Sequence, residues 1–207
     1  MKSIHGFAVL ACAALFGLTS ATGASAADVA KLIENCSNCH GKDGASTESD
    51  VPIIGGVSAQ YIIDSMTAYK KKARPCPETK YHAGSKKGQK TTMCQVAKDL
   101  GDADVKELAK HFAGKKFVRA PQKTDAALAK KGKELHDRRC EKCHSDGGSV
   151  AADDGGILAG QWMPYLRETF KDYSAGKRPM PEKMKPKMRN LSKDDTEALV
   201  HYYGSFK

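Results

Sequence analysis

The sequence lacks three patterns that would each assign it to a common class of protein. No stretch after residue 26 is apolar enough to cross a membrane. No segment keeps the alternation of apolar and polar residues that predicts a sheet. No glycine fingerprint of the G-x-G-x-x-G type is present, so the chain has no dinucleotide-binding turn of that kind. These absences favour an all-α protein.

The first 26 residues have the composition of a secretory signal. Lys2 supplies the positive charge, residues 7–18 form an apolar run, and Ala24-Ser25-Ala26 is a small-residue cleavage site. The alternative is a transmembrane anchor, but the apolar run is too short to span a bilayer comfortably. We therefore predict a cleaved signal peptide at residues 1–26 and a periplasmic mature chain without a membrane span.

The chain is basic, with a net charge of +10 that falls to +9 without residues 1–26, since these contain Lys2 and no acid. Nucleic-acid binding is one explanation for such a charge. The lysines are scattered, however, and no nucleic-acid motif is present. We therefore expect a solvated, lysine-rich surface and no nucleic-acid partner.

Two pentapeptides of the form C-x-x-C-H, Cys36–His40 and Cys140–His144, lie 104 residues apart. This spacing is the attachment signature of a c-type haem. The two thiols form thioether bonds to one porphyrin, and the histidine becomes the proximal ligand of its iron. We therefore predict two covalently bound haem c groups. Their thioethers would come from Cys36, Cys39, Cys140 and Cys143, and their proximal ligands would be His40 and His144.

The pentapeptides belong to a longer internal repeat. At an offset of 104 residues, Ile53 falls on Ile157, Tyr61 on Tyr165, Tyr69 on Tyr173 and Arg74 on Arg178. After Pro75 the offset becomes 91, so the first copy carries a 13-residue insertion before Met93. Two copies of one small domain are predicted, at residues 27–120 and 121–207, joined where Pro121 breaks a polar linker.

Each copy has the pattern of helices separated by loops. Helices are predicted at 28–35 and 126–139 before the haem motifs, and at 58–72 and 163–175 after glycine-rich loops. Ser192 and Asp195 resemble a capping box that begins the last helix. This order of elements resembles the class I cytochrome c fold. The predicted fold is therefore all-α, with two tandem class I cytochrome c domains, each wrapped around one haem.

Each iron also needs a sixth ligand, for which Met93 and Met184 occupy matching places seven residues before Leu100 and Leu191. A thioether ligand favours Fe(II) and raises the reduction potential. Met180 and Met188 are the alternatives in the second copy. Two protein ligands leave no open position on the iron, and this favours electron transfer over chemistry at the haem.

The seven cysteines leave one further pair. Cys12 is removed with the signal and four cysteines lie in the haem motifs, so Cys76 and Cys94 remain. In an oxidising compartment this even count predicts a disulfide, and the alternative is two free buried thiols. The bond would close a loop of about 18 residues beside Met93. The disulfide would either only stabilise a long loop, or hold that loop in a shape that binds a partner or tunes the first haem.

The remaining candidate residues have less specific interpretations. Arg74 and Arg178 are expected either to pair with haem propionates or to lie in solvent. His136 is expected to face outward, and His82, in the insertion, to be solvated. Five aromatic residues are expected to pack against a haem or to lie in the core: Tyr61, Tyr69, Trp162, Tyr165 and Tyr173.

The tandem layout resembles cytochrome c4 and related dihaem cytochromes. The second copy is similar to the dihaem cytochrome subunit of flavocytochrome c sulfide dehydrogenase, chiefly over residues 126–191, through 133–137, 140–144, 157–162, 164–166, 178–180 and 182–184. The first copy departs from that pattern through its insertion with Cys76.

The second resemblance implies a complex in which a flavoprotein subunit oxidises sulfide at its FAD. Electrons would pass to these haems and on to a soluble acceptor such as a small cytochrome c. The FAD would belong to the partner, and this chain would be an electron-transfer subunit rather than the catalyst. Two other functions stay open: a free-standing carrier of the cytochrome c4 type that feeds a terminal oxidase, and a haem enzyme such as a dihaem peroxidase or thiosulfate dehydrogenase.

Overall fold

The computed structural model describes residues 26–207, so the predicted signal peptide lies outside the described residues apart from Ala26. The first half contains α1 (Ala26–His40), η1 (Lys42–Gly44), α2 (Ala59–Lys70), β1 (Thr79–Lys80), β2 (Lys90–Thr91), α3 (Met93–Lys98) and α4 (Asp102–Ala113). The second half contains α5 (Ala126–Arg139), α6 (Ser145–Gly148), η2 (Ala151–Asp153), α7 (Met163–Ser174), α8 (Lys185–Met188) and α9 (Lys193–Gly204). The all-α prediction is confirmed, and no helix within residues 26–207 has the length and apolar character of a membrane span.

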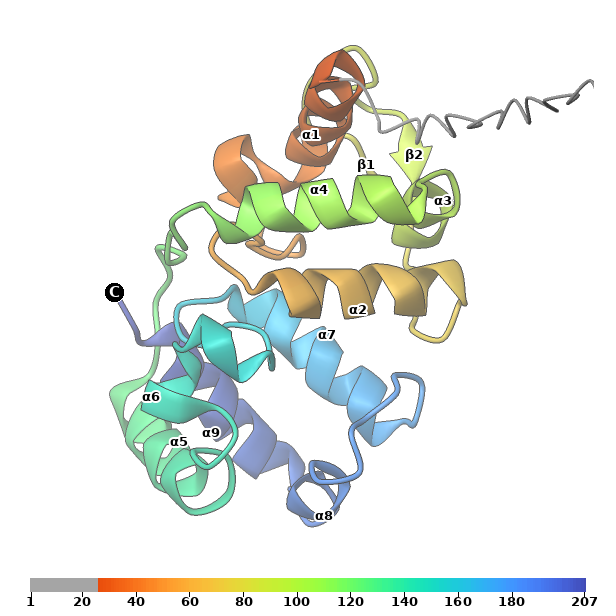
Figure 1. Cartoon of the computed structure of the whole chain (residues 1–207). Helices are drawn as coiled ribbons and strands as arrows, with labels where there is room; N and C mark the ends of the chain where they lie inside the picture. Colours follow the sequence, from red (N-terminus) through yellow and green to blue (C-terminus); the bar gives the residue numbers. More distant parts are fainter. Residues whose placement is uncertain (1–25) are drawn as a thin grey trace, which may run out of the picture.

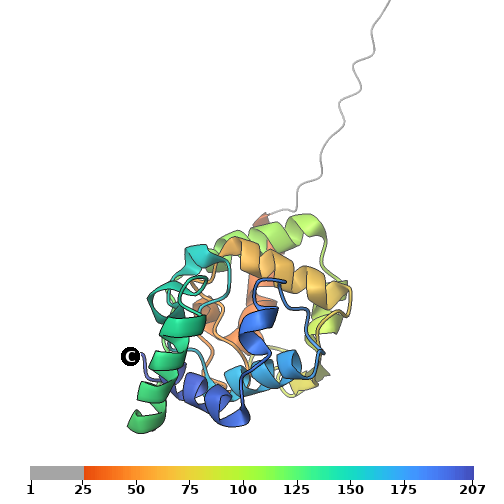
Figure 2. The same ribbon diagram turned by 90° about the horizontal axis from the view of Figure 1, so that it is seen from below.

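The two halves repeat one helical arrangement. The terminal helix α4 packs on α1 and α2 in the first half, and its counterpart α9 packs on α5 and α7 in the second. Figure 1 shows the first half above the second. The C-terminus lies next to the linker in Figure 1 and beside α5, which follows the linker, in Figure 2. Lys207 hydrogen-bonds with Arg119 and Gln122 of the linker.

Side-chain caps explain where several helices begin. Ser58 accepts a hydrogen bond from the Tyr61 amide at the start of α2, and Thr92 does the same for Gln95 at the start of α3. The capping box at Ser192 and Asp195 is present at the start of α9 as predicted. Such caps satisfy backbone amides that the first helical turn leaves unpaired.

The two haem motifs differ in their backbone. Helix α1 runs past its predicted end through the whole first motif to His40, whereas α5 ends at Arg139 and the second motif continues in turns. Backbone hydrogen bonds from the amides of Cys143 and His144 to the carbonyl of Cys140 close these turns, and the Glu141 carboxylate accepts hydrogen bonds from the amides of Asp146 and Gly147 in the loop that follows. The matching position in the first copy is Ser37, which has no carboxylate.

The prediction that His136 faces outward is wrong. The side chain is fully buried between α5 and α9. Its Nδ1 lies 3.0 Å from the Tyr203 hydroxyl and its Nε2 lies 2.7 Å from a Glu141 carboxylate oxygen. Because both ring nitrogens have partners, a polar side chain can be buried on this helix face at little cost.

The halves are held together by a small apolar cluster with polar links around it. Ile53, Ala120 and Trp162 form the cluster. The Gln161 side chain accepts a hydrogen bond from the Ile53 amide and donates one to the Ile53 carbonyl, both at 3.0 Å. The Trp162 indole donates to the carbonyl of Ser46 at 3.0 Å. Several contacts therefore fix the two halves relative to each other.

Replacing Trp162 with alanine is expected to destabilise the protein by about 3–5 kcal/mol, the usual cost of deleting a buried aromatic side chain. Trp162→Phe keeps most of the apolar surface and loses the hydrogen bond to Ser46, which is worth about 1 kcal/mol. Denaturant unfolding of the haem-loaded protein measures both values. A Trp162→Ala variant as stable as the wild type would show that this side chain does not hold the halves together.

Candidate haem-binding sites

The first motif places its three functional residues on the last turn of α1. His40 is buried, and its Nδ1 lies 2.8 Å from the carbonyl oxygen of Pro52. A carbonyl can only accept, so Nδ1 carries the proton and the lone pair of Nε2 is free for a metal. Burial lowers the pKa of His40, which keeps the ring in the neutral form that binds iron.

The second motif holds His144 in a different environment. The ring is largely buried, and its Nδ1 has no hydrogen-bond partner among the described residues. Gly155 lies so close that a Cβ at that position would be 2.6 Å from Cε1 of the imidazole. Burial, followed by the nearby charge of His136, lowers the pKa of His144. A neutral imidazole with an unsatisfied buried nitrogen fits a residue that binds an additional group.

The four motif cysteines suit thioether attachment. Cys36, Cys39, Cys140 and Cys143 all have free thiols. No group of three or more histidine, cysteine or acidic side chains within residues 26–207 is arranged to hold a bare metal ion. Burial raises the pKa of Cys36 to about 12, so its thiolate is not favoured as a metal ligand. Pairs of free thiols next to a neutral histidine therefore fit a covalently attached haem.

The predicted sixth ligands come from separate elements of each half. Met93 is the first residue of α3, which packs on α2, whereas the first haem motif ends α1, which packs on α4. Met184 is the residue immediately before α8. Both side chains are partly buried. Met93 and Met184 as iron ligands stay predictions.

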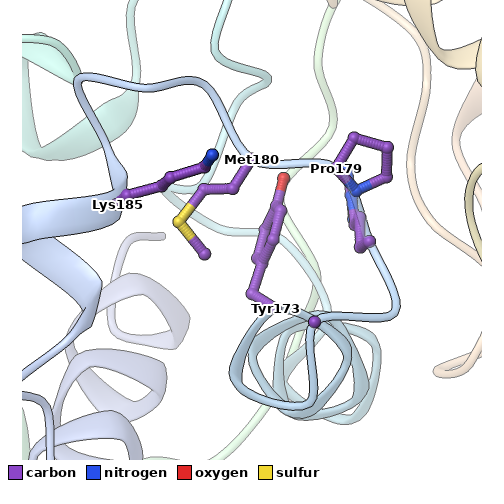
Figure 3. Close-up of a pocket in the computed structure, with 6 residues that line it drawn as sticks. Tyr173, Pro179, Met180 and Lys185 are labelled. Carbon is purple, nitrogen blue, oxygen red and sulfur yellow. The ribbon is translucent and has the colours of Figure 1, made fainter.

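The two alternative methionines of the second half have different surroundings. Met188 packs against the main apolar cluster of that half, which is the environment of a core residue. Met180 lines a pocket of about 440 Å³ together with Tyr173, Pro179 and Lys185 (Figure 3). Arg178 lies on the same pocket wall.

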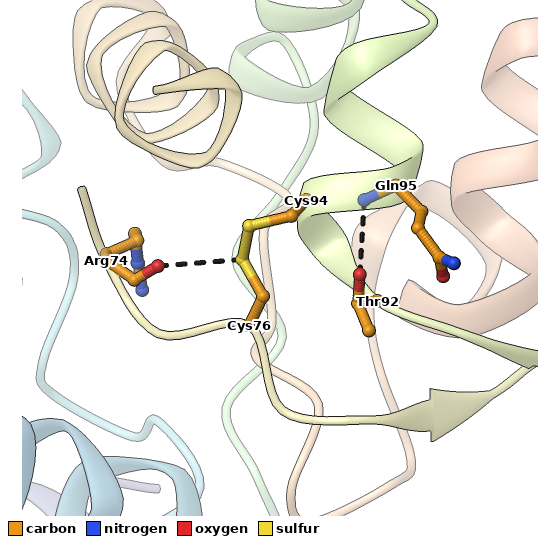
Figure 4. Close-up of a disulfide and its surroundings, with 5 residues drawn as sticks. All are labelled: Arg74, Cys76, Thr92, Cys94 and Gln95. Atoms are coloured by element: carbon orange, nitrogen blue, oxygen red, sulfur yellow. Dashed lines mark hydrogen bonds between the residues drawn. A yellow bond between two sulfur atoms is a disulfide. The ribbon is translucent and has the colours of Figure 1, made fainter. Parts of the chain in front are cut away.

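Cys76 and Cys94 are joined by a disulfide, with their Cα atoms 5.7 Å apart (Figure 4). The bond ties the segment after Arg74 to the first turn of α3, next to Met93. Cys76 Sγ also lies 3.5 Å from the carbonyl oxygen of Arg74. The disulfide therefore holds two predicted haem contacts of the first half, one at each end of the insertion.

A cluster of tyrosine and arginine side chains lies between the two halves. Arg74 and Arg178 are both buried, which excludes the alternative of solvated arginines. Arg74 stacks 4.3 Å from the ring centre of Tyr69, and Arg178 stacks 4.7 Å from that of Tyr173, its repeat equivalent. Arg178 also donates a hydrogen bond of 2.9 Å to the hydroxyl of Tyr61 in the other half.

This cluster has a surplus of positive charge. No ion pair between either arginine and a carboxylate is found within residues 26–207. Burial raises the pKa of Tyr165, but Arg178 and Arg74 outweigh that effect and lower the pKa to about 7. Buried guanidinium groups without carboxylates require another anion. Haem propionates meet that requirement through charge-assisted hydrogen bonds.

Two family models match the chain in succession. The model described as cytochrome c matches residues 26–113, and that described as cytochrome c oxidase, cbb3-type, subunit III matches residues 127–202. A cytochrome c4 of Stutzerimonas stutzeri is 29% identical over 177 residues, which are 79% of this chain and 80% of that protein. The crystal structure of reduced recombinant cytochrome c4 from Pseudomonas stutzeri has a TM-score of 0.70 and 26% identity, over 88% of this chain and 99% of that one. The chain is a cytochrome c4-like protein with tandem class I cytochrome c domains.

More distant solved structures share the fold of this cytochrome c4-like protein. Cytochrome c4 of Acidithiobacillus ferrooxidans has a TM-score of 0.67 at 24% identity, over 84% of this chain and 99% of that one. Thiosulfate dehydrogenase of Marichromatium purpuratum also has a TM-score of 0.67, at 23% identity, over 83% of this chain but 36% of the other. Cytochrome c domains imply covalently bound haem c and an electron-transfer role.

Three residues that help to shape the sites were not identified from the sequence. Pro52 orients His40 through its carbonyl, Gly155 makes room for the His144 ring, and Glu141 folds the loop after the second motif. The repeat did not single out Pro52, because the matching position in the second copy is Gly156. A backbone carbonyl also has no signature in a sequence.

Proposed function

We propose that the mature protein is a periplasmic electron carrier with two haem c groups, which passes single electrons from a donor to a soluble acceptor. The observation that carries the proposal is the repeated C-x-x-C-H motif, in which free thiols lie beside a neutral histidine that is buried in the first half and partly buried in the second. Haem c supplies a one-electron Fe(III)/Fe(II) couple when bound.

The residues of the chain would position and tune that couple. His40, oriented by Pro52, and Met93 would be ligands of the first iron, and His144 and Met184 would be ligands of the second. Arg74 and Arg178 would bind the propionates between the halves and hold both haems near the same interface. Two filled iron positions would leave no place for a substrate to bind.

For the electron donor we propose a flavoprotein subunit that oxidises sulfide at an FAD. Residues 126–191 support this choice, because they resemble the cytochrome subunit of flavocytochrome c sulfide dehydrogenase. The second candidate is a free-standing carrier that feeds a terminal oxidase, and the similarity to cytochrome c4 favours it. In both cases the chain transfers electrons and does not catalyse the oxidation itself.

Purification from a native source under gentle conditions separates these two candidates. In the first case an FAD-containing protein copurifies with the cytochrome, and sulfide reduces the haems of the complex in anaerobic stopped-flow spectroscopy. The cytochrome freed of that partner is the control and is expected to reduce much more slowly. A cytochrome that purifies without flavin, or a complex whose haems sulfide does not reduce, would contradict the sulfide-oxidising role and leave the free carrier.

A further inference from the structure

Three polar side chains, His136, Tyr203 and Glu141, form a hydrogen-bonded network beside the second haem motif, and we call it the His136 network. His136 of α5 is fully buried, and it contacts the Tyr203 hydroxyl of α9 through Nδ1 and the Glu141 carboxylate through Nε2. The two helices lie side by side (Figure 1). Burial raises the pKa of the Cys140 thiol, and a hydrogen bond with the Tyr203 hydroxyl lowers it. The network therefore extends from a thioether cysteine of the second haem to Glu141.

The first half has other residues at all three positions of the network. The repeat places Leu32 opposite His136, Ser37 opposite Glu141 and Phe112 opposite Tyr203. Helices α1 and α4, which carry Leu32 and Phe112, pack on each other in the first half as α5 and α9 do in the second. The same helix contact is therefore made without a buried imidazole, so the fold alone does not explain the network.

The partners of Glu141 decide which nitrogen of His136 can gain or lose a proton. The Glu141 carboxylate accepts hydrogen bonds from the amides of Gly147 and Asp146, and the bond from Gly147 is the main cause that lowers its pKa. An ionised carboxylate only accepts hydrogen bonds, so Nε2 of His136 carries a hydrogen and donates it. Proton uptake and release by the ring therefore take place at Nδ1, which faces Tyr203.

The Tyr203 hydroxyl has one hydrogen and two neighbours that can accept it. When the His136 ring is neutral, Nδ1 has a lone pair and accepts that hydrogen. When the ring is protonated, Nδ1 donates to the Tyr203 oxygen, and the hydroxyl can donate to Sγ of Cys140, which as a thioether only accepts. The protonation state of His136 therefore decides whether the thioether sulfur receives a hydrogen bond.

Protonation of His136 would favour Fe(II) at the second haem for two reasons. It adds a positive charge at a buried site, where charges interact more strongly than in water. It also directs a hydrogen-bond donor at the sulfur that joins the porphyrin to the chain, and hydrogen bonds around a haem help to set its potential. The Glu141 side chain is 42% exposed, so a proton from solvent has a route to the buried ring.

The other charged or ionisable groups near the network are found on α5, α6, α8, α9 and the motif: Lys133, Asp137, Arg139, Cys140, His144, Asp146, Lys187 and Tyr202. Lys133 and Asp137 pair with each other, and Asp146 is exposed. Burial raises the pKa of Tyr202, so it stays protonated. With the haem attached, the cysteine is a thioether and the histidine an iron ligand, and neither takes up a proton. His136 is therefore the group of this cluster that is suited to titrate in response to the haem.

We propose that the His136 network couples electron uptake at the second haem to uptake of a proton, a property that the first haem does not share. This inference rests on the proposed electron-carrier function and deepens it. One electron from the donor reduces Fe(III) to Fe(II), and His136 takes up as much as one proton from water by way of Glu141; reoxidation returns both. The three residues act on the iron through Cys140 and its surroundings, so they are positioning residues.

Potentiometry at several pH values, followed by NMR, tests the coupling on the haem-loaded protein. The methyl signals of each porphyrin identify their haem through contacts with its own half. Between about pH 5 and pH 8, the range in which histidines titrate, the Fe(II)-to-Fe(III) ratio at a fixed applied potential is expected to fall with rising pH at the second haem. The fall is expected to exceed that at the first haem on the order of tenfold, as for one unit of charge in a buried site. The same pH dependence at both haems would overturn the proposal.

Substitutions toward the residues of the first half identify the side chains responsible. The double variant His136→Leu, Tyr203→Phe has the apolar pair of the first half and is expected to give both haems the same pH dependence. Tyr203→Phe alone loses the hydrogen bond but keeps the charge of His136, and it is expected to keep part of the difference. Tyr202→Phe, the matched control, removes a hydroxyl outside the network and is expected to match the wild type. A double variant with the wild-type difference would show that other groups bind the proton.

Nitrogen-15 NMR of the histidine-labelled wild type observes the proton directly and does not depend on any variant folding. As the pH falls, the Nδ1 signal of His136 is expected to change from that of a lone-pair nitrogen to that of a protonated one, and to do so at higher pH in the Fe(II) protein. A ring that stays in one state, or that titrates equally in both redox states, contradicts the coupling and leaves the carrier intact. If the haems cannot be reduced and reoxidised reversibly, the carrier function itself fails.

Discussion

Replacing Met184 with alanine is expected to lower the reduction potential of the second haem on the order of 0.1–0.2 V, within the ~0.8 V range that axial ligands span. The cause is the loss of a thioether that stabilises Fe(II). The iron would also gain an open position, so the reduced variant would bind carbon monoxide and the ferric variant cyanide. Optical potentiometry and ligand titration measure both effects.

Met188→Ala and Met180→Ala are the matched controls for that experiment. Met188 packs against the core of the second half, so its loss is expected to cost about 2–5 kcal/mol of stability while the potential stays near the wild-type value. Met180 lines an open pocket, and its loss is expected to have a smaller effect on stability. If one of these variants, rather than Met184→Ala, opened the iron to carbon monoxide, that methionine would be the ligand.

The double variant Cys140→Ala, Cys143→Ala is expected to carry one haem per chain where the wild type carries two. Without the two thiols no thioether bond can form in the second half, and the first motif is unaffected because it has its own cysteines. Haem content by the pyridine haemochrome assay and the mass of the intact chain give the count.

Two further variants control the haem count. Cys36→Ala, Cys39→Ala is the counterpart in the first half and is expected to give the same loss of one haem. Cys76→Ala, Cys94→Ala removes two cysteines outside the motifs, and both haems are expected to remain. If a double motif variant does not accumulate, the single Cys143→Ala protein decides the point, since one remaining thioether gives a distinct haemochrome spectrum. A wild-type chain with a single haem would contradict the two-haem proposal.

The main features of the fold were predictable because they depend on residues close together in the chain. Apolar spacing predicted the helices, and the capping box at Ser192 marked the start of α9. The single change of offset revealed the insertion, although not its form: β1 and β2 are too short to show a strand pattern, and their pairing depends on contacts with α1. Hairpins of this size need such tertiary support.

The environment of individual side chains was less predictable. Nothing near His136 in the sequence indicates that Tyr203, 67 residues away, would satisfy one nitrogen and allow the ring to be buried. The arginine pair shows the same limit. The repeat made Arg74 and Arg178 equivalent, but their burial depends on the way the two halves meet.

The sequence by itself determined two haem-attachment motifs with their histidines, a repeated domain, and a further pair of cysteines, Cys76 and Cys94. These are patterns of spacing along the chain, and the C-x-x-C-H spacing is the signature of covalent haem attachment. Tertiary structure alone decided that the hairpin of β1 and β2 packs against the first haem motif, whereas Cys143 of the second motif is exposed. It also decided that two arginines share one buried, positively charged site. Both outcomes arise from contacts between distant residues, such as Asn38 with the hairpin and Tyr61 with Arg178, which no local pattern records.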